Sequence, residues 1–171
     1  RVESKLEVCP ENEKKTAKEG PADLPAGLYV VATPIGHAAD ITLRALTVLR
    51  AADMIACEDT RVTAQLLALH GIARPLTRYD EHTAATAGPT LMAKIKSGAR
   101  VALVSDAGTP LVSDPGGRLV RACVDENLTV VPIPGPSAVL AALAVAGLPT
   151  ERFLFAGFPP TRTGARRRFY E

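Results

Sequence analysis

The sequence predicts an α/β fold, a three-layer sandwich around a mostly parallel five-stranded sheet. Short β-rich apolar runs at 28–32, 101–104 and 130–133 each lead into a loop of glycine, proline and small polar residues. Apolar residues recur at helical spacing over 41–49, 119–124 and 139–145, which indicates amphipathic helices. Repeated strand, loop and helix units predict parallel strands joined by right-handed crossovers, with the strand-to-helix loops gathered at one sheet edge.

The expected elements alternate along the chain. The predicted strands cover 28–32, 53–57, 75–79, 100–105 and 129–133, and the predicted helices cover 41–51, 61–69, 85–97, 116–126 and 137–146. Asp40-Ile41-Thr42 supplies an N-cap for the first helix, while Gly71 and Gly98 stand at expected C-cap positions. After the helix-breaking residues 148–150, the apolar run 153–160 is typical of an extended strand that leaves the sandwich.

Three segments are expected from composition. Residues 1–26 mix charges without periodicity and predict a disordered N-terminal tail, and residues 27–150 form the α/β domain. Residues 151–171 are expected to be a linker and the start of a missing C-terminal domain, because the chain stops inside a basic, helix-like segment.

Charge and cysteine content restrict the function classes. The net charge of +2 is too small to indicate a nucleic-acid-binding protein by itself, but residues 161–171 hold four basic side chains against one acidic. This basic end fits either phosphate contacts or a solvated helix. The three cysteines are too far apart for a metal site and favour a reducing compartment, and no window is apolar enough to span a membrane, so a cytoplasmic location is expected.

Several familiar chemistries are disfavoured by the motifs. The first strand-loop-helix unit lacks the dinucleotide pattern G-x-G-x-x-G, and no P-loop lysine is present. Ser137 follows Gly135 as in a nucleophile elbow, but the final glycine is missing, so a helix cap is favoured. The three histidines have no metal-ligand spacing, and no metal is expected.

Polar residues remain at the expected loop edge. Glu58, Asp59 and Arg61 follow the second strand and fit either an ion-pair cluster at a helix start or a group that faces a substrate. Asp106 fits either a turn residue that bonds its own backbone or a site residue. Rigid loops with small side chains and no activated nucleophile suit a reaction that depends on positioning, such as methyl transfer from a sulfonium donor.

Five segments together resemble a known family. They are 28–36 (LYVVATPIG), 40–46 (DITLRAL), 56–61 (ACEDTR), 102–116 (ALVSDAGTPLVSDPG) and 131–138 (VPIPGPSA). In order and spacing they resemble the bacterial small-subunit ribosomal RNA methyltransferase I family, within the tetrapyrrole methylase superfamily. The resemblance implies a homodimeric enzyme that uses S-adenosylmethionine to methylate the 2′-hydroxyl of a cytidine in small-subunit (16S) ribosomal RNA, with the 30S subunit or its RNA as partner.

The resemblance also implies site residues. The residues expected to line the donor site come from three loops and are Pro34, Ile35, Gly36, Thr109, Val112, Ser137 and Ala138. Those expected on the substrate side are Glu58, Arg61 and His37. The family motif assigns no catalytic base, and the candidates near the cleft are Asp59, Glu81, His82 and Asp106.

The sequence departs from the family pattern in two places on the substrate side. His37 stands where the family has Asn, and the segment 79–83 replaces a histidine-rich pattern. Two alternatives therefore stay open. One is a tetrapyrrole or diphthine methyltransferase of the same superfamily, and the other is a truncated, non-catalytic ligand-binding domain.

Overall fold

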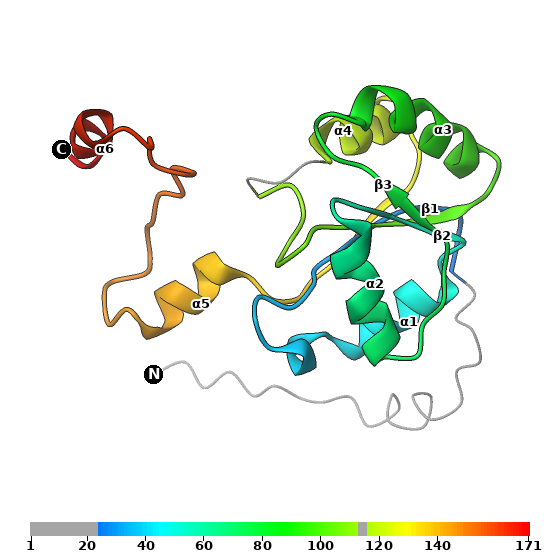
Figure 1. Cartoon of the computed structure of the whole chain (residues 1–171), viewed down its shortest axis with the longest axis horizontal. Helices are drawn as coiled ribbons and strands as arrows, with labels where there is room; N and C mark the ends of the chain where they lie inside the picture. Colours follow the sequence, from blue (N-terminus) through cyan, green and yellow to red (C-terminus); the bar gives the residue numbers. More distant parts are fainter. Residues whose placement is uncertain (1–23, 113–115) are drawn as a thin grey trace, which may run out of the picture.

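The structure is a computed structural model that describes residues 24–112 and 116–171. Within these residues, five parallel strands form one sheet in the order β3-β2-β4-β1-β5 (Figure 1). The strands are β1 (Gly27–Val31), β2 (Met54–Cys57), β3 (Leu76–Arg78), β4 (Arg100–Val104) and β5 (Val130–Ile133). The predicted α/β class and the parallel sheet are confirmed.

The central strands are buried on both faces. Every residue of β1 and β2 is buried, and β1 pairs with β4 through Leu28 opposite Val101 and Val30 opposite Leu103. Continuous apolar runs of this kind are typical of parallel strands covered by helices on both sides.

Helices cover the two faces and make three layers (Figure 1). The helices are α1 (Leu43–Ala51), α2 (Thr60–Leu69), α3 (Ala84–Lys96), α4 (Gly117–Asp125), α5 (Ala138–Val145) and α6 (Thr163–Tyr170), with a short 3-10 helix η1 (Ala38–Asp40). One core cluster joins the sheet to α1 and α2 through residues such as Val48 and Leu67. The other joins it to α3 and α4 through Leu91 and Leu119.

This distribution creates a crevice between β1 and β4. The chain leaves β1 toward α1 on one face, whereas it leaves the neighbouring β4 toward α4 on the other face. The loops that follow these two strands therefore diverge at the carboxyl edge of the sheet. Open α/β sheets bind ligands at such a switch point.

The expected helix ends are largely confirmed. Thr42 caps α1, because its Oγ1 accepts a hydrogen bond from the Ala45 amide at 3.1 Å. Gly71 and Gly98 follow α2 and α3 with φ of 62° and 97°, the left-handed conformation of a C-terminal cap.

Two expectations about the C-terminal part are wrong. All eight residues of α5 are Ala, Val or Leu, so the helix is apolar on every side rather than amphipathic. None of these eight residues is buried. The run 153–160 forms no strand within the described chain, because both edges of the sheet end at β3 and β5 and the run pairs with neither.

The N-terminal tail predicted for 1–26 lies mostly outside the described residues. The described chain begins at Leu24, which packs against the α1/α2 core cluster. The Tyr29 hydroxyl donates to the carbonyl of Pro25 at 2.6 Å. Residues 24 and 25 thus contact the α/β domain.

Candidate functional site

The loops after β1 and β4 are joined across the crevice by backbone hydrogen bonds. The amide of Thr33 donates to the Gly108 carbonyl at 2.9 Å, and the amide of Gly108 donates back to the Thr33 carbonyl at 3.0 Å. The buried Thr33 hydroxyl also donates to the carbonyl of Ser105 at 3.1 Å. Since these contacts are between residues about 75 positions apart, they fix one loop against the other.

The loop after β5 joins the same group. Thr109 Oγ1 donates to the Pro136 carbonyl at 3.2 Å. Gly135 passes so close to β1 that a Cβ there would lie 3.0 Å from Ala32 Cβ. The loop after β5 therefore approaches the end of β1 through Gly135, and it accepts a hydrogen bond from Thr109 of the loop after β4.

A cavity of about 350 Å³ opens where the three loops meet. Its described lining consists of Ile35, Ala107, Gly108, Thr109, Val112, Ser137, Ala138, Val139, Phe155, Gly157 and Phe158. Five of the seven residues expected at a donor site thus share one cavity. Pro34 and Gly36 flank Ile35 but are not among these lining residues.

The chemistry of this lining favours recognition by shape and backbone. No lining residue in the described chain is charged, and the side-chain polar groups there are the hydroxyls of Thr109 and Ser137. The Ser137 hydroxyl accepts from the Leu140 amide at 3.4 Å, so the expected helix cap is confirmed. A mostly apolar cavity of this size with a few fixed polar groups is typical of a small-molecule site.

Gly108 is required by this geometry. Its φ of 83° lies in the left-handed region, and a Cβ there would come within 3.3 Å of Ile35 Cγ2. A side chain at this position would strain the backbone and press on the cavity wall at once.

Sequence reasoning did not place Phe155, Gly157 and Phe158 in the site. They belong to the apolar run 153–160, which was expected to leave the sandwich. A signal was present in the run itself, because three phenylalanines in a segment without a strand partner indicate an exposed apolar surface, and such surfaces often bind ligands.

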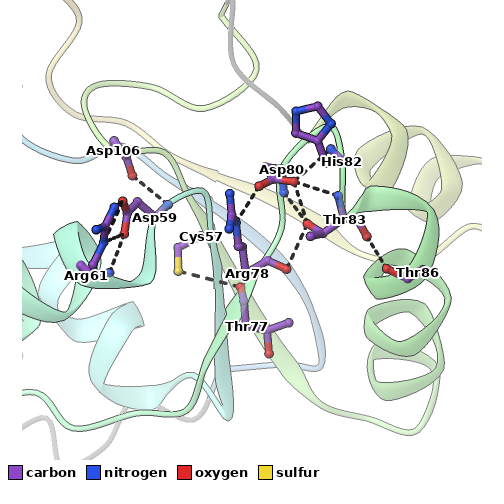
Figure 2. Close-up of polar contacts among 10 residues, drawn as sticks. All are labelled: Cys57, Asp59, Arg61, Thr77, Arg78, Asp80, His82, Thr83, Thr86 and Asp106. Carbon is purple, nitrogen blue, oxygen red and sulfur yellow. Dashed lines mark hydrogen bonds and ion pairs between the residues drawn. The ribbon is translucent and has the colours of Figure 1, made fainter.

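A second group of polar residues lies at the ends of β2 and β3 (Figure 2). We call Asp59, Arg61, Arg78, Asp80 and His82 the polar edge. Asp59 begins α2, where its carboxylate accepts from the Arg61 amide at 2.8 Å and from the Arg61 guanidinium at 2.6 Å. The hydrogen bonds from Arg61 hold the pKa of Asp59 well below its usual range. A carboxylate of such low basicity that is already paired is a poor general base.

Asp106 connects the polar edge to the loop after β4. Its Oδ1 accepts from the Asp59 amide at 3.1 Å, so this carboxylate binds the loop after β2 (Figure 2). Asp106 is exposed, and the next residue, Ala107, lines the cavity. Among the four candidate bases, Asp106 is the one adjacent in sequence to the cavity lining.

Asp80 organises the turn after β3, although it was not among the expected site residues. This buried carboxylate accepts from the amides of His82 and Thr83 at 2.9 and 2.8 Å and from Arg78 Nε at 2.7 Å. These hydrogen bonds, led by the Thr83 amide, lower the pKa of Asp80 to about 2. The Asp80 turn therefore presents Glu81 and His82 as exposed side chains at fixed backbone positions.

The other expected substrate-side residues lie on the same carboxyl edge of the sheet. His37 is exposed, and its Nδ1 accepts from the Ala39 amide at 3.3 Å, which caps η1. Glu58 is half-buried directly after β2. Neither residue lines the cavity in the described chain.

Cys57 and Tyr79 lie under the polar edge as core residues. The Cys57 thiol is buried and donates to the Thr77 carbonyl at 3.8 Å (Figure 2). Burial raises the pKa of Cys57 and of Tyr79. Neither group is suited to act as a nucleophile or base near neutral pH.

A second hollow, of about 450 Å³, lies between α3 and α4. It is lined by residues such as Met92, Arg118 and Ala122, and the ion pair between Lys96 and Glu126 spans 2.5 Å beside it. It lies between helices of one face and not at the switch point between β1 and β4, so it is separate from the loop cavity.

Among the described residues, no cluster of three or more His, Cys, Asp or Glu side chains could hold a metal ion. No helix in the same part of the chain is long and apolar enough to cross a membrane.

Comparison with known proteins identifies relatives. Residues 27–169 match the profile of the family described as Tetrapyrrole (Corrin/Porphyrin) Methylases. The chain is 59% identical over 152 residues to a protein of Mesorhizobium japonicum named "Ribosomal RNA small subunit methyltransferase I", covering 86% of this chain and 52% of the relative. It is 52% identical to the protein of the same name from Escherichia coli O157:H7, covering 82% of this chain and 49% of the relative.

The chain spans about half the length of these relatives. Among solved structures it resembles the uroporphyrin III C-methyl transferase of Thermus thermophilus, with a TM-score of 0.54 and 25% identity over 77% of this chain and 57% of the other. The family resemblance inferred from the five sequence segments is therefore confirmed by the matching family profile and by the names of these relatives.

Proposed function

Because this chain belongs to the tetrapyrrole methylase family, we propose that it forms the donor-binding part of a methyltransferase that acts on small-subunit ribosomal RNA. The donor is S-adenosylmethionine, and the acceptor is the 2′-hydroxyl of a cytidine. The printed names of the relatives support the RNA substrate. The working enzyme is a cytoplasmic homodimer that acts on the 30S subunit or its RNA.

One observation is the main support for a donor-binding site in the cavity. Three loops that are distant in sequence are bound to one another around a single cavity, and Ile35, Thr109 and Ser137 all line it. These are the positions that the family resemblance assigns to donor binding. Such a meeting at the switch point of the sheet supports a ligand site there.

The residues present fit the donor. S-adenosylmethionine supplies a methyl group on a positively charged sulfur, and the cavity offers apolar walls, two hydroxyls and backbone groups. Ile35 and Val112 would contact the apolar parts, and the Gly108 backbone allows close approach. An apolar wall favours the loss of the sulfonium charge over the charged starting state.

The polar edge would receive the acceptor ribose. Arg61, Glu58 and His37 would contact the RNA, and Arg61 is held in place by Asp59. Asp106 is the favoured proton acceptor from the 2′-hydroxyl, because it is exposed beside the cavity lining. Asp59 is disfavoured for this role because its carboxylate is paired and its pKa is low. Glu81 and His82 remain secondary candidates.

Methyl transfer with a radiolabelled donor tests the function. The full-length protein is incubated with tritiated S-adenosylmethionine and purified 30S subunits, and the labelled RNA is then hydrolysed in alkali. We expect label in an alkali-resistant dinucleotide, because a 2′-O-methyl group blocks cleavage at that position. A parallel reaction contains uroporphyrinogen III in place of the 30S subunits. Label on uroporphyrinogen III and none on RNA would support the tetrapyrrole alternative, which the 25% identity to a C-methyl transferase structure makes worth testing.

Calorimetry on this chain tests the donor site separately. We expect S-adenosylhomocysteine to bind and flavin mononucleotide not to bind. Binding of the flavin alone would support a non-catalytic ligand-binding module.

A further inference from the structure

Helix α6 presents a basic and aromatic surface that the proposed site does not use. Its sequence is TGARRRFY, preceded by Arg162 at the N-cap and followed by Glu171. No residue of α6 is buried, and Figure 1 shows the helix away from the α/β sandwich. We call Arg162, Arg166 and Tyr170, which are spaced by four residues, the α6 patch; Arg168 lies on the opposite side of the helix.

The charges of the α6 patch are available for a partner. Arg167 forms an ion pair with Glu171 at 3.2 Å. The two arginines of the patch, Arg162 and Arg166, have no carboxylate partner among the residues that the structure describes. By contrast, Arg61, Arg78 and Arg100 are each paired with an aspartate. The two free guanidinium groups give the patch the charge and the donors to bind anions.

An aromatic ring lies beside these charges. Arg166 and Tyr170 are four residues apart and so share one side of the helix. Tyr170 is 71% exposed, and its ring packs edge-on against Phe169 with centroids 5.3 Å apart. Arginine next to an exposed, supported aromatic ring is typical of surfaces that bind single-stranded nucleic acid, because bases stack on the ring while the cations contact phosphates.

The patch is also tethered close to the donor cavity. Phe158 lines the cavity, and Arg162 follows it by four residues. An extended chain of four residues spans at most roughly 14 Å. An RNA strand whose acceptor ribose lay beside the cavity, where Asp106 precedes the lining residue Ala107, would therefore have its neighbouring nucleotides within reach of α6.

We propose that the α6 patch binds the single-stranded RNA flanking the methylated nucleotide, through contacts of its arginines to phosphates and a base stacked on Tyr170. This inference rests on the proposed RNA substrate and adds the surface that holds it. Because phosphate contacts are independent of sequence, the patch contributes affinity rather than choice of nucleotide.

Fluorescence anisotropy with the full-length protein tests the proposal. The probe is a labelled single-stranded RNA of twelve nucleotides with mixed sequence, and an RNA duplex of the same length is the comparison. The test variant is Arg162→Gln/Arg166→Gln. The control is Lys94→Gln/Arg121→Gln, which removes the same charge from exposed positions on α3 and α4.

We expect the test variant to bind the single strand at least about tenfold more weakly, and the slope of log affinity against log salt to shrink by about 1.4, since each lost phosphate contact contributes about 0.7. Tyr170→Ala should weaken the single strand about tenfold and leave the duplex unchanged. The control should keep the wild-type affinity and slope.

Several outcomes would overturn the proposal. One is equal loss in test and control variants, and another is unchanged binding in both. A third is a wild-type protein that binds vesicles containing phosphatidylserine through α6 but not RNA, which would assign the patch to a membrane surface. Calorimetry with S-adenosylhomocysteine on the same samples checks folding and the donor site, so a failure of donor binding is read separately from a failure of α6.

Discussion

The loop cavity and the polar edge both lie at the carboxyl edge of the sheet but are built in different ways. The cavity loops are held by the Thr33–Gly108 backbone pair and by close approach of glycines. The polar edge is held by carboxylates, with Asp59 bound to Arg61 and Asp80 bound to Arg78 and two amides.

Because of this difference, the cavity and the polar edge should respond to different substitutions and to pH in different ways. A backbone-built cavity depends on glycine conformation and tight packing, and it changes little with pH. A carboxylate-built edge depends on charge, and it should weaken in acid and tolerate changes of backbone shape elsewhere. The predictions that follow are ways to test this contrast.

Gly108→Ala should have the largest effect on donor binding. The new Cβ meets Ile35 Cγ2 at 3.3 Å on a backbone with φ of 83°, so we expect at least about a tenfold loss of S-adenosylhomocysteine affinity by calorimetry. Gly71→Ala is the matched control, with φ of 62° and open space around its Cβ. It should cost about 1–2 kcal/mol of stability without changing affinity. Equal affinity losses would contradict the cavity.

Asp80→Ala should have the next largest effect, on stability. It leaves the amides of His82 and Thr83 and the Arg78 side chain without their acceptor, so the midpoint of thermal unfolding should fall by several degrees while donor affinity is kept.

The same carboxylate gives a pH dependence with a defined sign. The folded pKa of Asp80 is about 2, below the ordinary value of 3.8, so its stabilisation is full above about pH 4 and is lost as the pH falls through 2. Asp80→Asn should flatten this part of the acid unfolding curve, measured by circular dichroism. An unchanged curve would show that Asp80 does not hold the turn.

Thr109→Val should have a moderate effect. It removes the hydroxyl that joins the loops after β4 and β5, which costs about 0.5–1.5 kcal/mol and should weaken donor binding several-fold. Thr47→Val removes a comparable hydroxyl bond to Leu43 on α1, and it should leave the calorimetric affinity unchanged.

Arg61→Gln should have the smallest effect on stability. Its side chain is 86% exposed, and exposed ion pairs contribute little, so the unfolding midpoint should not move measurably. Single-turnover methylation of 30S subunits should still slow several-fold, whereas Arg121→Gln on α4 should not slow it. A normal rate in Arg61→Gln would remove this residue from the substrate side.

The sheet and the cavity loops could be predicted because they have local signals. The apolar, β-rich runs predicted the first and last residue of each strand to within two positions. Proline and glycine after three of these runs indicated rigid loops, and parallel topology then required those loops to meet at one edge.

Other features depend on tertiary context. The partner of Asp106 is the amide of a residue 47 positions away, which no local pattern indicates. The burial of Asp80 arises from packing of the whole turn, which no local pattern indicates. The run 153–160 contributes Phe155 and Phe158 to the cavity, and the spacing of its apolar residues could not distinguish that role from a strand.

The most direct test of the account is an NMR titration of this isotope-labelled chain with S-adenosylhomocysteine. The account predicts that the largest amide shifts fall on Ile35, Gly108, Thr109 and Ala138, on three loops distant in sequence. Shifts confined to the hollow between α3 and α4, with those loops unchanged, would contradict it.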